Sequence, residues 1–162
     1  MDWLNFAVVV CVQLGTLSLV VREQGDARAW KGRQLTTALA VGLIFGIAFD
    51  LVFGKLFGVF SYALGFTPLF LVMNGIFSYG VFFVTVRALH RASRTAFYAW
   101  SVGMAFLYEL TNAAFPVWSW QFASSALRKE LVAIFVLYGA LMVPAALVLE
   151  AVTGVRFRIF RR

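Results

Sequence analysis

Two acidic residues lie within long apolar stretches of this sequence, and each is followed by an aromatic-Ser-aromatic triplet. Asp50 precedes Phe60–Ser61–Tyr62, and Glu109 precedes Trp118–Ser119–Trp120, with about ten residues between acid and triplet in both cases. An ionisable side chain costs about 2.5–3.5 kcal/mol at the centre of a membrane, and such residues usually face the interior of a bundle or a wet cavity. Asp50 and Glu109 are therefore the candidate catalytic residues.

A carboxylic acid in such a cavity would serve as a general acid toward an apolar substrate. The competing interpretation is structural, because an acid within a turn or so of the membrane surface reaches water at little cost. The residue types alone leave these two interpretations open.

Six further side chains are candidates for substrate binding. Asn112 lies three residues after Glu109 and so on the same helix face, and Asn74 is an amide near the middle of another apolar stretch. The others are the aromatic members of the two triplets, whose π-faces would stabilise a cation, namely Phe60, Tyr62, Trp118 and Trp120. An aromatic belt at the membrane interface would contain the same residue types.

Composition excludes a soluble domain. Of 162 residues, 62% are hydrophobic and 13% charged, against roughly 45–50% and about 25% in soluble proteins. The polar-apolar alternation of a membrane β-barrel is absent. With one Cys, one His and no phosphate-binding loop or metal-ligand pair, we expect no cofactor and no metal.

The apolar stretches predict an all-α membrane bundle of about five transmembrane helices in a single domain, 1–162. The predicted spans are about 3–21, 35–53, 67–89, 95–115 and 131–152. Eleven Lys and Arg residues lie in the first loop, the third joint and the tail, against Lys55, Arg128 and Lys129 on the other side. This asymmetry predicts an outside N-terminus and a cytoplasmic C-terminus, in a plasma (inner) membrane.

On that topology spans two and four run in the same direction and carry their acids at similar depth, toward the outer leaflet. Spans 2–3 and 4–5 would then form an internal repeat. The basic residues are explained by membrane orientation, so no nucleic-acid partner is expected.

The two acid-plus-triplet stretches make the region from Phe49 to Trp120 resemble the membrane-embedded carotenoid and terpene cyclases of the small lycopene cyclase type. The resemblance implies cavity acids, one of which protonates an alkene, and aromatic residues that stabilise the resulting cation. The Pro and paired acids of those cyclases are missing, since Leu69, Phe70 and Leu71 follow Pro68. Without these residues the resemblance still implies binding of an isoprenoid or another lipid, but not cyclisation.

Three functions remain as hypotheses, and whether the protein is an enzyme stays open. The first is an intramembrane protein that binds or acts on an isoprenoid, a carotenoid or another apolar lipid through Asp50 and Glu109. The second is a non-catalytic accessory subunit that docks against other membrane protein subunits and lipids. The third is a small proton-coupled transporter, which would use the same two acids.

Overall fold

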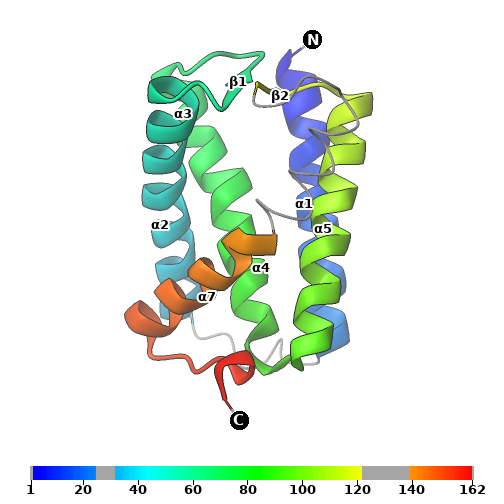
Figure 1. Ribbon diagram of the computed structural model, residues 1–162, viewed down its shortest axis with the longest axis vertical. Helices are drawn as coiled ribbons and strands as arrows, with labels where there is room; N and C mark the ends of the chain where they lie inside the picture. The colour runs from blue at the N-terminus through cyan, green and yellow to red at the C-terminus, as the bar shows by residue number, and fades with distance from the viewer. Residues whose placement is uncertain (1, 25–31, 122–138, 162) are drawn as a thin grey trace.

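The computed structural model describes residues 2–24, 32–121 and 139–161, which form a mostly helical bundle (Figure 1). Within these ranges, three segments are long and apolar enough to cross a membrane: Asp2–Glu23, Gly32–Leu56 and Pro68–Arg91. Large apolar side chains such as Ile44 and Leu56 point away from the protein, with 71% and 74% of their surface exposed. The fold is therefore the helical one predicted, and it is compatible with insertion in a membrane.

The helices lie close to the predicted spans. The first is α1, Asp2–Gln24, and the second is α2, Gly32–Phe49, which continues as a π-helical segment, η2, Asp50–Leu56. The third predicted span contains four consecutive segments. They are the α-helix α3, Pro68–Asn74; the π-helical segment η3, Gly75–Gly80; the α-helix α4, Val81–Ala88; and the 3₁₀ turn η4, Leu89–Arg91.

Helix α5, Arg94–Ala114, corresponds to the fourth predicted span, and α7, Gly139–Thr153, to the second half of the fifth. Residues 131–138 of that fifth span, with Arg128 and Lys129, lie outside the described residues. Membrane crossing by α5 and α7 stays a prediction. A short 3₁₀ helix, η6, Arg158–Phe160, follows α7 in the sequence.

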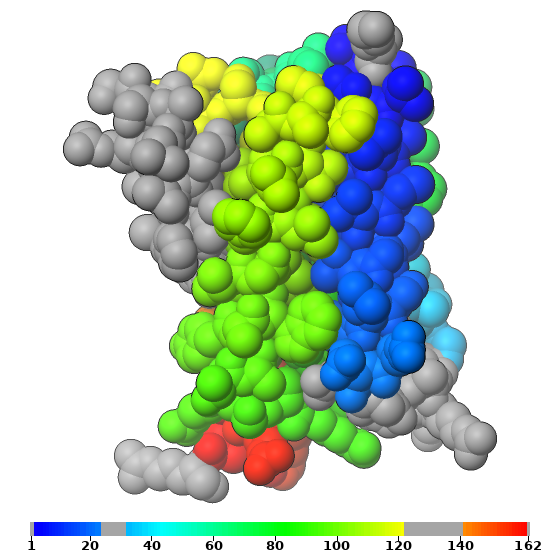
Figure 2. All heavy atoms as spheres, turned by 90° about the vertical axis from the view of Figure 1, so that its right-hand side faces the viewer, coloured from blue at the N-terminus to red at the C-terminus, as the bar shows by residue number. Residues whose placement is uncertain are grey.

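Helix α4 forms the centre of the bundle. It contacts α1, α2 and α7, and in Figure 1 it lies between α2 on one side and the α1–α5 pair on the other. Figure 2 shows α1 and α5 side by side along their length. The main core is built of small and medium apolar residues together with four buried rings, Phe83, Phe97, Tyr108 and Phe157.

A two-stranded antiparallel sheet covers one end of the bundle, the end at which the N-terminus lies (Figure 1). Its strands are the two triplets, β1 (Phe60–Tyr62) and β2 (Trp118–Trp120). Phe60 pairs with Trp120, Ser61 with Ser119, and Tyr62 with Trp118. The central serines share a hydrogen bond of 2.9 Å on the exposed face, so the aromatic side chains of both strands turn toward the bundle.

Local sequence signals position this sheet. Pro116 ends α5, because the residue before a proline is disfavoured in the helical conformation, and β2 begins two residues later. Gly58 and Gly65, on either side of β1, have φ of 62° and 63°, which glycine adopts without steric cost. Thr67 then caps α3, accepting a hydrogen bond from the Phe70 amide, with Pro68 in the first turn.

Gly42 and Gly46, the GxxxG pair of α2, lie against η3. A Cβ atom at Gly42 would lie 2.6 Å from the backbone Cα of Gly80, and one at Gly46 would lie 2.4 Å from the Tyr79 ring. α2 and η3 can therefore pack closely only because Gly42 and Gly46 have no side chains, which is the role of GxxxG pairs in membrane helices.

We expect Gly42→Ala to destabilise the protein by about 1–3 kcal/mol, because the added methyl group meets backbone that cannot move aside. Thermal unfolding in detergent would measure the change. Gly15→Ala is the matched control, since a Cβ there has nothing within 4 Å. Equal midpoints for the two variants would contradict the close contact between α2 and η3.

Candidate functional site

Asp50 is fully buried and accepts three hydrogen bonds. The hydroxyl groups of Tyr62 and Tyr79 donate to Oδ1 at 2.9 and 2.8 Å, and Nδ2 of Asn74 donates to Oδ2 at 2.9 Å. The same Nδ2 lies 3.1 Å from the Tyr62 hydroxyl oxygen. Both oxygens of the Asp50 side chain therefore accept hydrogen bonds from the surrounding side chains.

The three donors come from different segments, and two π-helical turns bring them together. Asp50 is the first residue of η2, Asn74 immediately precedes η3, and Tyr79 lies within η3. A π-helical turn places residues five apart on one face, and such turns are frequent at functional sites. Asn74 and Tyr79, five residues apart, can therefore both reach the same carboxylate.

Tyr62 joins this cluster to the sheet. Burial, followed by the nearby Asp50 carboxylate, raises the pKa of the Tyr62 phenol well above its ordinary value. The phenol therefore keeps its proton at neutral pH and continues to donate to Asp50. This hydrogen bond fixes β1 to the junction of α2 and η2.

Glu109 forms a corresponding cluster under β2. It is 3% exposed, and its Oε1 accepts hydrogen bonds from the indole N–H groups of Trp120 at 3.1 Å and Trp118 at 3.4 Å. Each buried acid therefore binds an aromatic residue of the triplet that follows it in the sequence.

The Asn112 amide is engaged by backbone rather than by the cavity. Its Oδ1 accepts from the amides of Val117 and Trp118 at 2.8 and 3.0 Å, and its Nδ2 donates to the Trp118 carbonyl at 2.9 Å. These bonds hold the turn from α5 into β2. In the structure, Asn112, a predicted substrate-binding residue, thus holds β2 in position.

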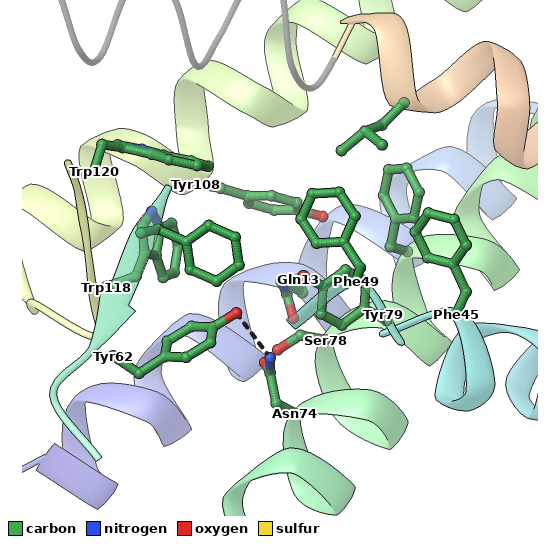
Figure 3. A pocket seen from close by; sticks show the side chains of 13 residues that line it. Gln13, Phe45, Phe49, Tyr62, Asn74, Ser78, Tyr79, Tyr108, Trp118 and Trp120 are labelled. Atoms are coloured by element: carbon green, nitrogen blue, oxygen red, sulfur yellow. Dashed lines mark hydrogen bonds between the residues drawn. The ribbon is translucent and has the colours of Figure 1, made fainter. Parts of the chain in front are cut away.

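A cavity of about 90 Å³ lies beneath the sheet, between α1, α2, η3 and α5 (Figure 3). Nine of the thirteen described residues that line it are aromatic: Phe45, Phe49, Phe60, Tyr62, Tyr79, Phe82, Tyr108, Trp118 and Trp120. The others are Gln13, Asn74, Ser78 and Leu141. Asn74 and the four predicted aromatic residues of the triplets therefore line the same cavity.

Asp50, Glu109 and Asn112 are not among the residues that line the cavity. The two carboxylates lie behind the wall and bind its Tyr, Asn and Trp side chains from outside. The lining itself includes no charged side chain among the described residues. The catalytic role predicted for the two acids stays a prediction, whereas their contacts identify them as anchors of the wall.

The sequence reasoning did not select Tyr79, Tyr108 or Gln13 as cavity residues. The signal for Tyr79 was its separation of five residues from Asn74, which places the two on one face only in a π-helical turn. Gln13 is a polar residue within the first apolar stretch, where a contact with a neighbouring helix is a common role. Nothing in the local sequence distinguishes a polar residue that faces a neighbouring helix from one that faces a cavity.

Among the described residues, no group of three or more His, Cys, Asp or Glu side chains could hold a metal ion. The chain matches no protein-family model, no curated protein and no solved structure.

We expect Asn112→Ala to destabilise the protein by about 1–3 kcal/mol, because it leaves the Val117 and Trp118 amides without their acceptor. Chemical unfolding in detergent, followed by tryptophan fluorescence, would measure the loss. Asn5→Ala is the control, since Asn5 is only partly buried and donates one bond, of 3.1 Å, to the Pro116 carbonyl in the same turn. Equal stability of the two variants would show that Asn112 does not hold β2.

Proposed function

We propose that the protein binds one end of an apolar, unsaturated lipid of the isoprenoid or carotenoid type in the cavity beneath the β1–β2 sheet. The observation that carries this proposal is the cavity wall: of the thirteen lining residues in the described part of the chain, nine are aromatic and none is charged. Aromatic faces pack against conjugated or branched chains at low entropic cost and attract positive charge. This matches the ligand class implied by the resemblance to lycopene cyclases.

The size of the cavity favours an end of the ligand rather than the whole molecule. Its volume of about 90 Å³ is below the roughly 300–1,000 Å³ of pockets that enclose drug-sized ligands. A long isoprenoid would place its end under the sheet and leave the remaining chain in the bilayer. Membrane lipids would then surround both the protein and the outer part of the ligand.

Asp50 and Glu109 act in this proposal by fixing the wall. Each holds an aromatic member of the sheet by hydrogen bonds, at 2.9 Å for Tyr62 and 3.1 Å for Trp120. If the ligand develops a positive charge, as an alkene does on protonation, two buried carboxylates behind π-faces would also stabilise it. Binding requires only the wall, and catalysis would require a proton donor in addition.

The test is photo-crosslinking with geranylgeraniol that carries a diazirine near its hydroxyl end, in nanodiscs that contain the purified protein. We expect labelled peptides to map to cavity residues such as Phe49, Tyr79 and Trp118, in preference to the lipid-facing Ile44 and Leu56. Labels spread evenly over the lipid-facing surface would count against the cavity.

Asp50→Asn and Glu109→Gln should each reduce cavity labelling several-fold, because the wall loses a charged acceptor for its Tyr or Trp donors. Glu23→Gln is the control, since Glu23 is an exposed acid near the end of α1. Unchanged labelling in both acid variants would contradict their anchoring role.

We also propose that the sheet and cavity face the outer leaflet and that the basic end is cytoplasmic. The support is the positive-inside asymmetry of the loops and the position of the sheet at the end of the bundle opposite the C-terminus (Figure 1). In intact cells, with Cys11 replaced by Ser, a membrane-impermeant thiol reagent should label Ser61→Cys and not Arg33→Cys. The reverse pattern would invert the orientation.

A further inference from the structure

Gln13, in the middle of α1, is a buried amide that lines the cavity and has incomplete hydrogen bonding. Its side chain is 6% exposed, and Oε1 is buried with no hydrogen-bond partner among the described residues. Figure 3 shows the amide at the cavity, in the company of Asn74 and Ser78. A buried polar group without a partner costs free energy, and it costs most in an apolar membrane interior.

The neighbouring polar residues of α1 behave differently. The Thr16 hydroxyl donates to the Val12 carbonyl at 2.8 Å, and the Ser18 hydroxyl donates to the Leu14 carbonyl at 2.9 Å. Both are satisfied within their own helix, as is common in membrane helices. Gln13 instead lines the cavity, and its Oε1 atom has no hydrogen-bond partner among the described residues.

The other side-chain amide that lines the cavity, that of Asn74, already donates hydrogen bonds. Nδ2 of Asn74 is directed to Asp50 at 2.9 Å and to the Tyr62 hydroxyl at 3.1 Å. Asn74 is therefore not the donor for Gln13, whose Oε1 has no hydrogen-bond partner among the described residues, and we look for that donor in what occupies the cavity.

The chemistry of the wall excludes an anionic group as that donor. An anionic head, such as a carboxylate or a diphosphate, would lie among aromatic faces with no Lys or Arg in the described lining, and near two buried carboxylates. A hydroxyl group is neutral and both donates and accepts, so it complements an amide in either orientation.

We infer that the ligand of this cavity is an isoprenoid alcohol whose hydroxyl group donates to Gln13 while the adjoining carbons pack against the aromatic wall. This rests on the proposed function and specifies its ligand: a chain that ends in a hydroxyl group rather than a plain hydrocarbon. Gln13 is the specificity-determining residue, and the hydroxyl end of the ligand lies inside the cavity.

The experiment compares three tritium-labelled probes with the same chain: farnesol, farnesyl methyl ether and farnesene. Binding to the protein in nanodiscs is measured at equilibrium, with binding to empty nanodiscs subtracted. We expect the wild-type protein to bind farnesol about tenfold more tightly than the ether, which lacks the donor. Gln13→Met, which keeps the side-chain volume, should abolish this preference and bind farnesene as the wild type does. Gln121→Met, at an exposed glutamine beside the sheet, should retain it.

The outcomes separate the two proposals. Equal binding of farnesol and its ether by the wild-type protein would overturn the role of Gln13 and leave cavity binding intact, and would point to water as the partner of the amide. If the Gln13→Met variant still binds farnesol more tightly than the ether, the role of Gln13 is overturned as well. Failure of all three probes to exceed empty nanodiscs would overturn the proposed function itself. The wild-type comparison needs no variant, so it stands even if Gln13→Met does not fold.

Discussion

The buried carboxylate of Asp50 is the group on which the arrangement of the site depends. A carboxylate in this position is tolerated only when its oxygens are hydrogen-bonded, and here the donors come from three segments: β1, the end of α3 and η3. Satisfying it therefore sets the position of β1 over the bundle and the position of η3 against α2. The absence of side chains at Gly42 and Gly46 allows η3 to come close enough.

Glu109 performs a parallel role on the other side of the sheet. Asp50 holds the Tyr of the first triplet and Glu109 holds the indoles of the second, and antiparallel pairing joins Tyr62 directly to Trp118. The two acids are thus connected through the strands that they anchor. The internal repeat predicted from the echo of the two stretches stays a prediction, whereas the pairing of the triplets is an observed contact.

The cavity beneath the sheet has a mostly aromatic lining in the described part of the chain. The acidic side chains of Asp50 and Glu109 do not line it but bind lining residues. The rings of Phe49, Phe60 and Tyr79 form one continuous contact series, with centroids 5.9 and 6.1 Å from Phe49. Buried carboxylates behind such rings make the space favourable for neutral or positively charged occupants and unfavourable for anions. The isoprenoid proposal and the hydroxyl-end inference both follow from this distribution of charge.

For the described residues, the sequence by itself determined the helices, their approximate bounds and the two buried acids, because long apolar stretches with few charges favour helices that satisfy their own backbone. It also marked the two triplets as related. Only the tertiary structure decided that they pair with each other, that Asp50 and Glu109 lie behind the cavity wall, and that Asn112 supports β2 while Gln13 faces the cavity. Periodicity and composition are local, whereas strand pairing, π-helical turns and hydrogen-bond partners depend on segments that meet only when the chain folds.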